Sequence, residues 1–425
     1  MIASRLAQKL PFHFGWIIAI TASAVIFACL GMARFGLGML LPSMGDDLSL
    51  SYSQMGYISS GNFAGYLLSV ALVPYSLKIF GARKVIVFGL FLIATTTVAM
   101  SQMQGFPAAV IVYLFTGMGS GFANIPVMAL LSHWFSSQYR GRAAGIAVVG
   151  SSFAIMASGL SVPEINQNFG ASGWRIGWGS IGGLSAFIAL LCWLILRDSP
   201  KDLGLQAVGE KGTNGTIKEP LSDTSPPKLL NGLMLNIGVI YFAFGATYMT
   251  YGTFIITTLI NEFGYSENVA GGLWFWIGFL SLFSGLIFGP LSDKLGRKAT
   301  IIIVYTIQTG AYGLAAVASS GWVLYLSLGL YGIAVFSVPA VISAMMGDYL
   351  GPKRAAAGLS FVTFFFAAGQ VIGPASAGMT ADIFGSFTPA YGFSALVTAL
   401  AVVATIMLKP PPDSDAPHNL DGNGV

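Results

Sequence analysis

The most constraining feature of this sequence is a series of apolar runs, each long enough to cross a bilayer. A helix rises 1.5 Å per residue, so about 20 apolar residues span the hydrocarbon core. Long unbroken runs differ from the short alternating segments of a membrane β-barrel. We therefore expect an all-α membrane protein with 12 transmembrane helices. The expected spans are 15–41, 54–77, 84–103, 107–133, 143–163, 176–196, 232–258, 269–290, 299–318, 322–346, 356–379 and 388–408.

Charged residues are too few to cover a water-facing surface. They make up 8% of the 425 residues, against about 25% in soluble domains, while hydrophobic residues make up 55%. The expected surroundings are therefore the lipid bilayer. The formal net charge of +4 comes with no patch rich in lysine and arginine, so the sequence gives no indication of nucleic-acid binding.

Side chains suited to catalysis or metal binding do not cluster. The histidines, His13, His133 and His418, are far apart in the sequence, and there is no phosphate-binding P-loop. The two cysteines lie in separate apolar runs, which excludes a disulfide scaffold. We expect no enzyme activity, no cofactor and no bound metal.

The distribution of basic residues predicts the orientation, because cytoplasmic loops are enriched in lysine and arginine. Eighteen of the 20 lysines and arginines fall on the side of the two termini and the even-numbered loops. The odd-numbered loops hold Arg175, and Arg34 lies inside the first span. We therefore expect both termini in the cytoplasm and a multi-pass protein of the plasma membrane.

A polar stretch rich in glycine and proline separates the first six predicted spans from the last six. The expected organisation is a six-helix half at 1–196, a flexible cytoplasmic loop at 197–231, a second six-helix half at 232–409 and a disordered cytoplasmic tail at 410–425.

Each half carries a related loop after its second span. Gly81 and Gly296 in these loops are 215 residues apart, and the Ala-Gly pairs at 144–145 and 357–358 are 213 residues apart. Two pairs of positions at nearly the same offset indicate a duplicated six-helix unit.

The loop of the second half, G-P-L-S-D-K-L-G-R-K at 289–298, resembles the G-x-x-x-D-R/K-x-G-R-R/K signature of the major facilitator superfamily. The copy in the first half departs from it, with Pro74 and Lys78 at the positions of the leading glycine and the acid. The resemblance implies the major facilitator fold, with two pseudo-symmetric halves. It also implies a gating role for Gly289, Asp293, Gly296, Arg297 and Lys298. Simple anchoring of basic loops at the cytoplasmic surface is the alternative.

Further motifs resemble the monocarboxylate and oxalate–formate porter branches of that superfamily. They are H-W-F at 133–135, R-G-R-A-A-G at 140–145, G-W-R at 173–175 and R-D-S-P-K-D-L-G-L at 197–205. This resemblance implies a transporter of small molecules in the bacterial inner membrane, which we expect to function as a monomer.

Arg34 is the one charged residue well inside a predicted span. An ionised side chain there costs about 2.5–3.5 kcal/mol, so it is usually retained for function. Gly31 and Gly38 lie on its helix face and leave room beside it. Because a guanidinium forms two parallel hydrogen bonds with a carboxylate, we expect Arg34 to bind the anionic group of a substrate. The alternative is a structural arginine that extends outward to Asp46 or Asp47.

Polar and aromatic side chains at helical spacing on other spans predict a hydrated central path. The resemblance places helices 1, 4, 7 and 10 around a cavity. The further substrate-binding residues that we expect are Asn62, Tyr66, Asn124, Tyr248, Tyr251 and Gln370. Interhelical hydrogen bonding, or an interfacial aromatic belt, is the alternative role of such side chains. Trp274 and Trp276 are expected to be interface anchors.

The predicted function is secondary transport of a small organic anion, with a monocarboxylate as the first choice, by alternating access around a midplane site. No Asp or Glu lies in the middle of a span, which argues against a built-in carboxylate proton relay. Two alternatives remain open. One is an exporter of an amphipathic or aromatic compound, and the other is a non-transporting membrane sensor on the same fold.

Overall fold

The computed structural model describes residues 11–210, 231–351 and 354–408. Helices make up nearly all of these segments, and β-structure within them is limited to one bridge between Phe135 and Val208. The predicted tail at 410–425 and most of the predicted loop at 197–231 lie outside the described residues. The expectation of an all-α membrane protein is confirmed.

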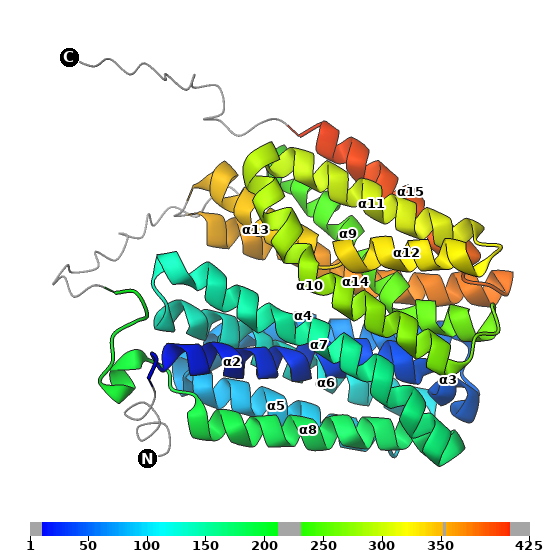
Figure 1. The fold of residues 1–425 in the computed structure, drawn as a ribbon, viewed down its shortest axis with the longest axis horizontal. Helices are drawn as coiled ribbons and strands as arrows, with labels where there is room; N and C mark the ends of the chain where they lie inside the picture. Colours follow the sequence, from blue (N-terminus) through cyan, green and yellow to red (C-terminus); the bar gives the residue numbers. More distant parts are fainter. Residues whose placement is uncertain (1–10, 211–230, 352–353, 409–425) are drawn as a thin grey trace.

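Two halves of six helices build the fold (Figure 1). The first helix runs without interruption through α2 (Gly15–Ile26), the π-helix η1 (Phe27–Phe35) and α3 (Gly36–Leu48). The rest of the first half consists of α4 (Tyr52–Phe80), α5 (Ala82–Met100), α6 (Phe106–Trp134), α7 (Ser137–Phe169) and α8 (Gly173–Ile195). The second half consists of α9 (Gly232–Asn261), α10 (Glu267–Leu295), α11 (Arg297–Val317), α12 (Gly321–Ala334), α13 (Ser337–Leu350), α14 (Ala355–Phe384) and α15 (Thr388–Ile406).

The described residues contain the expected 12 spans, because one of their long helical segments consists of two spans. Among the described residues, 11 helical segments are long and apolar enough to cross a membrane, and one of them covers 59 residues from Ser137 to Ile195. That segment turns at Gly170, where φ is +57°, and therefore contains both α7 and α8. The tenth span consists of α12 and α13, which are separated at Phe336, whose amide donates a hydrogen bond to Ser284 (3.3 Å).

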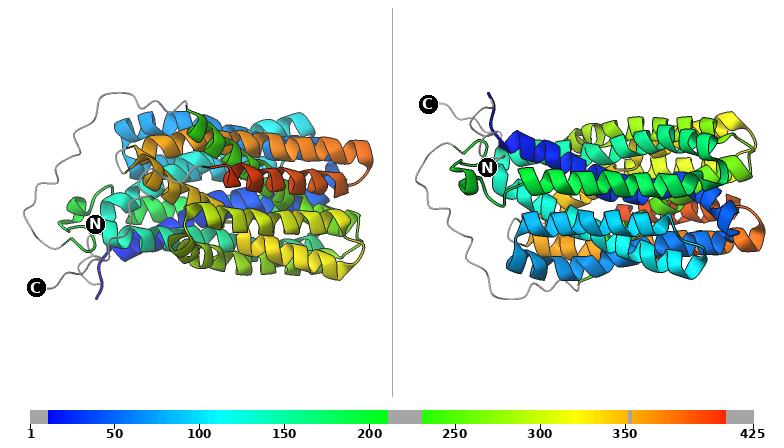
Figure 2. Two further views of the ribbon diagram at one scale, coloured as in Figure 1. Left: turned by 90° about the horizontal axis from the view of Figure 1, so that it is seen from above. Right: turned by 90° about the horizontal axis from the view of Figure 1, so that it is seen from below.

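The helices run roughly along the long axis of the molecule, and α2 begins at the end where α15 stops (Figures 1 and 2). That end carries the loops with Arg140 and Arg297, and we call it the basic end. The opposite end, which carries Asp47, Glu262 and Asp382, we call the acidic end.

Glycines allow the helices within each half to pack backbone against backbone. A Cβ atom at Gly117 of α6 would lie 1.8 Å from the Asn62 carbonyl oxygen of α4. In the second half, a Cβ atom at Gly373 of α14 would lie 2.1 Å from the Ala246 carbonyl oxygen of α9. Membrane helices gain packing energy from such close approach, because no hydrophobic effect drives them together.

The sequence repeat is visible in the backbone. Gly81 between α4 and α5 and Gly296 between α10 and α11 have φ values of +79° and +86°. These values lie in the left-handed region that favours glycine. Both turns reverse the chain at the basic end of their own half, which agrees with a duplicated unit.

Hydrogen bonds between the halves, among the described residues, lie between the middle of the molecule and the acidic end. They join Ser152 to Ser281, Ser158 to Trp274, Ser59 to Thr253, Asn166 to Glu267, and Asp382 to the amides of Tyr52 and Ser53. Asp382 therefore caps the N-terminus of α4 from the opposite half, where the helix dipole favours a negative charge.

Small residues on α7 and α10 continue this interface towards the basic end without making contact. Near the middle, a Cβ atom at Gly278 of α10 would lie 2.9 Å from the Ser152 carbonyl oxygen of α7. One heptad further towards the basic end, a Cβ atom at Gly145 or at Gly285 would meet nothing within 4 Å. The halves are thus joined at the acidic end and separated along these two helices at the basic end.

Part of the predicted central loop packs against the first half. The Val208 amide donates a 2.9 Å hydrogen bond to the Trp134 carbonyl, and the Trp134 indole donates one of 2.9 Å to the Arg197 carbonyl. Asp198 accepts a 2.7 Å hydrogen bond from the Arg83 amide at the start of α5. Residues 197–210 therefore cover the basic end of the first half, a contact that the expectation of a flexible loop did not include.

Replacing Gly117 with leucine is expected to destabilise the protein, because the new side chain meets backbone atoms of α4. Overpacking a core costs about 1–3 kcal/mol, and backbone atoms yield little. The melting temperature of the detergent-purified protein should fall by about 1–3 °C. Gly183→Leu is the matched control, since a Cβ atom at Gly183 meets nothing within 4 Å. Equal melting temperatures for the two variants would contradict this account of the packing.

Candidate substrate-binding site

Arg34 lies near the middle of the first helix, on η1. π-Helical turns are rare and often occur at functional sites. Gly31 allows η1 to approach α7 closely, since a Cβ atom there would lie 2.1 Å from the Ala154 side chain. The Tyr113 hydroxyl of α6 donates a 2.8 Å hydrogen bond to the Ala33 carbonyl. Contacts with two neighbouring helices therefore hold the backbone that carries Arg34.

The Arg34 side chain is a buried cation that has no anionic partner among the residues that the structure describes. It is 9% exposed, and its Nε and Nη2 atoms have no hydrogen-bond partner. The guanidinium carbon lies 4.9 Å from the ring centre of Phe63 and 4.8 Å from that of Tyr66. Cation–π contacts contribute about 0.5–2 kcal/mol each, which is less than the penalty of several kcal/mol for removing an ion from water. The charge is only partly compensated.

The acidic residues at the nearby helix end do not pair with Arg34. Asp47 accepts hydrogen bonds from the Arg175 guanidinium (3.1 Å) and from the Trp174 indole (3.0 Å). The other ion pairs among the described residues involve Arg297 at the basic end. The alternative of an outward-directed structural ion pair is therefore not observed for Arg34.

Four other residues that the sequence indicated lie around Arg34. The Tyr66 ring faces its guanidinium, and Asn124 donates a 2.9 Å hydrogen bond to the Tyr66 hydroxyl. The Tyr248 hydroxyl interacts with the Arg34 guanidinium and accepts a hydrogen bond from Gln370. These residues come from α4, α6, α9 and α14, so both halves contribute to one cluster around a single charge.

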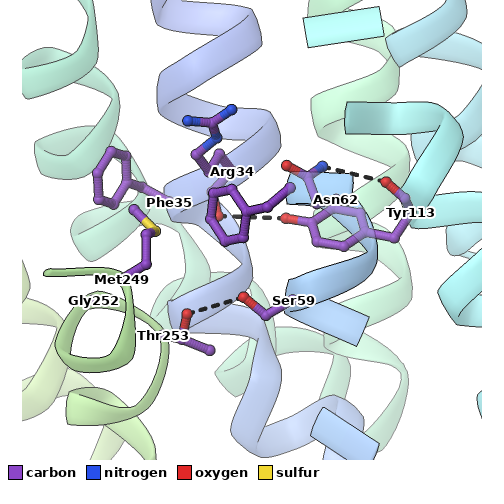
Figure 3. Close-up of a pocket in the computed structure, with 9 residues that line it drawn as sticks. Arg34, Phe35, Ser59, Asn62, Tyr113, Met249, Gly252 and Thr253 are labelled. Carbon is purple, nitrogen blue, oxygen red and sulfur yellow. Dashed lines mark hydrogen bonds between the residues drawn. The ribbon is translucent and has the colours of Figure 1, made fainter. Parts of the chain in front are cut away.

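A water-sized cavity lies beside Arg34 (Figure 3). Its lining residues are Arg34, Phe35, Ser59, Asn62, Phe63, Tyr113, Met249, Gly252 and Thr253. The volume of about 10 Å³ accommodates about one water molecule. Asn62 donates a 3.3 Å hydrogen bond to the Tyr113 carbonyl and leaves its own Oδ1 without a partner. A larger ligand has to approach the guanidinium from its other side.

The direction of the Arg34 side chain fits such an approach. Its guanidinium points away from the 3.1 Å hydrogen bond between Ser59 and Thr253, which joins the halves on the acidic side of the cavity (Figure 3). The unpaired nitrogen atoms are therefore directed towards the side of the basic end, where the halves separate.

Tyr251 lies apart from this cluster. Its hydroxyl forms a 2.7 Å hydrogen bond with Ser327, and its ring centre lies 4.4 Å from that of Tyr331. Tyr312 and Tyr391 pack around it as well. The structure thus places Tyr251 in an aromatic core inside the second half rather than beside Arg34.

Aromatic rings form a parallel stack next to Tyr248. The rings of Phe244 and Tyr248 on α9 lie 4.5 Å apart at an angle of 4°. Tyr241 on the same helix lies 4.6 Å from Phe366 of α14 at an angle of 14°. The cluster around Arg34 is therefore bounded on the second half by a flat apolar wall.

Two residues near Arg34 were missed at the level of sequence. Tyr113 lies one turn before Thr116, on the helix face that also carries Asn124, so extending that polar stripe would have identified it. Phe63 carries no polar atom, and its role is visible only from the position of the Arg34 guanidinium.

The signature loop of the second half makes its charged contacts within that half. Arg297 donates hydrogen bonds to Asp293 (2.5 Å) and to Asp348 near the end of α13 (2.8 Å). Lys298 donates a 2.7 Å hydrogen bond to the Leu408 carbonyl. Asp348 was not among the expected gating residues. Its position just after the tenth predicted span, next to a loop with basic residues, could have indicated it from the sequence.

The two glycines of this loop have different roles. Gly296 forms the left-handed turn between α10 and α11, which no other residue type adopts readily. A Cβ atom at Gly289 would meet nothing within 4 Å, so space does not require glycine at this position.

Trp274 is not an interface anchor. It is fully buried, and its indole donates a 3.1 Å hydrogen bond to Ser158 of the opposite half. Trp276, two residues further along the same helix, is 56% exposed, which agrees with the predicted anchor role.

Comparison with known proteins gives one family and several relatives. A family described as "Uncharacterised MFS-type transporter YbfB" matches residues 26–407. The chain is 24% identical to a hexuronate transporter of Bacillus subtilis (strain 168), over 87% of this chain and 90% of that protein. It is 23% identical to a quinolone resistance transporter of Acinetobacter baumannii, over 92% of each chain. It is 22% identical to a putative tartrate transporter of Agrobacterium vitis, over 96% of this chain and 92% of that protein.

The fold is also similar to solved structures. A D-xylose-proton symporter superposes with a TM-score of 0.73, over 93% of this chain and 98% of that chain. The sequences are 19% identical, so this similarity shows the shared fold alone.

Replacing Arg34 with methionine is expected to stabilise the protein, because it removes an unpaired buried charge and keeps the side-chain length. Exchanging buried ionic groups for apolar ones is often neutral or stabilising by about 1–4 kcal/mol. The melting temperature of the protein without ligand should rise by about 2 °C or more. Arg34→Lys keeps the charge and serves as the control, so its melting temperature should not rise. A fall in the melting temperature with methionine would show that the charge is satisfied in the protein.

Proposed function

This chain belongs to the family of MFS-type transporters that it matches over residues 26–407, and on that premise we propose that it transports a small organic anion. The observation that carries the proposal is the Arg34 guanidinium, which is buried between the halves with two nitrogen atoms unpaired. A carboxylate satisfies such a guanidinium with two parallel hydrogen bonds.

A monocarboxylate is the substrate class that fits the charge of the site. Arg34 is the one basic side chain in the cluster among the described residues, so one bound negative charge neutralises it. Hydrogen-bonding groups of Asn124 and Gln370 stand next to the tyrosines that contact Arg34. Relatives named for hexuronate and tartrate, which are organic acids, support an anionic substrate.

Alternating access is the mechanism that we propose. In this structure the two halves meet at the acidic end, and Arg34 lies on the basic side of that seal. The small-residue faces of α7 and α10 continue to Gly145 and Gly285 without contact. Closure of these faces, with opening of the acidic end, would present Arg34 to the opposite side of the membrane.

The signature loop is proposed to take part in that closure. Arg297 is held by Asp293 and Asp348 in the present conformation, and Lys298 is held by the Leu408 carbonyl. Because Asp293 lies at the basic end of α10, the helix that faces α7, approach of the first half would change these partners. A Cβ atom at Gly289 or Gly296 would meet nothing within 4 Å, so no neighbouring group confines the loop at these positions.

The basic end is proposed to lie in the cytoplasm. Eighteen of the 20 lysines and arginines belong to that side, which is the bias expected of cytoplasmic loops. The protein would then reside in the bacterial inner membrane with both termini in the cytoplasm, and the present conformation would be inward-facing.

Export of an amphipathic or aromatic compound is a second candidate. The stacked rings of Tyr241, Phe244, Tyr248 and Phe366 offer a flat apolar surface next to the site. A relative named for quinolone resistance gives this candidate further support. In this case Arg34 would be structural, which separates the two candidates by experiment.

Uptake by the purified protein in liposomes tests the first candidate. We expect uptake of at least one of radiolabelled L-lactate, D-glucuronate, L-tartrate and benzoate, and none of tetraphenylphosphonium. Arg34→Ala should lower that uptake at least tenfold, because the carboxylate loses its counter-charge, and Arg34→Lys should restore only part of it. Arg140→Ala removes an exposed basic residue and serves as the control. Undiminished anion uptake by Arg34→Ala would exclude the proposed role, and selective transport of the cation would favour the second candidate.

Labelling of a cysteine in the seal tests alternating access and orientation together. In a chain with Cys29 and Cys192 replaced by alanine, Ser59→Cys should react with a membrane-impermeant maleimide on intact cells whenever the acidic end opens. Gly145→Trp should lower this labelling at least fivefold, because its side chain obstructs closure of the basic end. Gly183→Trp, on a face without neighbours, should leave labelling unchanged.

Two results would contradict these proposals separately. Labelling that requires permeabilised cells would reverse the orientation. Labelling that is insensitive to Gly145→Trp would show that α7 and α10 do not close at the basic end.

A further inference from the structure

From the unpaired charge at the site we infer that the protein is an obligate exchanger. The halves reorient only while an anion is bound to Arg34, so an anion carried in one direction must be matched by an anion carried in the other. The second ligand of the transport cycle is therefore another organic anion rather than a proton or a metal ion. This inference rests on the proposed function, since it takes the ligand of Arg34 to be an anion.

The first step concerns the state of Arg34 during reorientation. Arg34 is only 9% exposed in the present conformation, and its guanidinium points away from the Ser59–Thr253 seal. The Nε and Nη2 atoms are already out of contact with water, and closure of the basic end would remove the exposure that the rest of the residue keeps. An occluded state without ligand would then contain a bare cation in a low-dielectric interior, which is strongly disfavoured.

The second step is that the part of the chain that the structure describes offers no internal substitute for the ligand. Among the described residues, the ionisable side chains found to interact with Arg34 include Cys29, Tyr66, Tyr113 and Tyr248. Cysteine and tyrosine side chains are ordinarily neutral at pH 7, so none of them balances the charge. The carboxylates of the sequence lie near the ends of the spans, and no Asp or Glu occupies the middle of one.

A proton cannot replace the anion in the return step. A guanidinium remains protonated throughout the physiological range and has no site for a further proton. In carriers coupled to protons, a carboxylate near the ligand site takes up the proton and becomes neutral. The cluster around Arg34 holds amides, hydroxyls and aromatic rings instead. Binding of an anion is thus the one event at this site that removes its net charge.

Flux into loaded and unloaded liposomes tests the inference. Labelled L-lactate, D-glucuronate and L-tartrate are each offered to vesicles that contain the same unlabelled anion or no organic anion. Potassium and valinomycin are present, so that charge movement does not limit uptake, and half of the samples carry an inward proton gradient. For the probe that is transported, we expect initial uptake at least tenfold faster into loaded vesicles, with no stimulation of unloaded vesicles by the proton gradient.

An added acid at the site should relax the requirement for exchange. Asn62 lines the same cavity as Arg34 and has an unpaired Oδ1, so Asn62→Asp places a carboxylate of the same shape beside the guanidinium. The ratio of loaded to unloaded uptake should fall at least fivefold. Asn62→Leu removes the amide without adding charge and should keep the high ratio.

The outcomes distinguish this inference from the proposal that underlies it. Uptake into unloaded vesicles at half or more of the loaded rate would overturn obligate exchange while leaving anion transport intact. An equal ratio in Asn62→Asp and Asn62→Leu would show that the charge of Arg34 does not control the return step. Absence of uptake of every probe under both conditions would overturn the proposed function and the exchange together.

Discussion

The constraint on which this structure depends is a positive charge held at mid-depth in a membrane protein, with no negative charge of the described residues beside it. The surroundings of Arg34 supply partial compensation from the rings of Phe63 and Tyr66 and from the Tyr248 hydroxyl. None of these groups is anionic. A folded protein tolerates such a site at a cost in stability, and functional sites are where that cost is commonly found. The unsatisfied charge therefore explains both the position of the site and its preference for an anion.

The interface between the halves is suited to repeated separation. Its polar contacts involve serine and threonine hydroxyls, as in the pairs Ser152–Ser281 and Ser59–Thr253, and the carboxylates of Glu267 and Asp382. Neutral hydrogen bonds between side chains contribute about 1 kcal/mol or less each between membrane helices. Such contacts are individually weak, so they can break and form again during transport. The same small residues continue along α7 and α10, so the opposite end can pack in a similar way.

Much of the fold could be predicted because lipid imposes a simple rule on the chain. Every span must satisfy its own backbone, so long apolar runs become helices, and the one charge among them is conspicuous. Helical spacing singled out Tyr66, Asn124 and Tyr248, and the structure gathers them with Gln370 around Arg34, although their role in binding stays a prediction. The limits of the spans were also close to those of the helices.

The remainder depended on tertiary contacts that leave no local pattern. Tyr248 and Tyr251 are three residues apart on α9, yet one faces the cluster and the other faces Ser327. Because α9 is surrounded by protein over most of its length, its faces show no contrast in polarity. The burial of Trp274 depends on its contact with Ser158 of α7, which the sequence of α10 alone does not reveal. For this reason Trp274 was assigned to the membrane interface. The π-helical turn at Arg34 has no recognised sequence signature in this chain.

The mid-depth position of Arg34 also makes the transport step sensitive to the valence of its ligand. A bound monoanion cancels the guanidinium charge, so the loaded halves reorient as a neutral body on which the membrane potential does no work. A bound dianion leaves one net negative charge inside the field. Moving that charge across the full membrane changes the free energy by about 2.3 kcal/mol per 100 mV. In an energised cell, voltage would therefore separate singly from doubly charged acids even where both fit the same site.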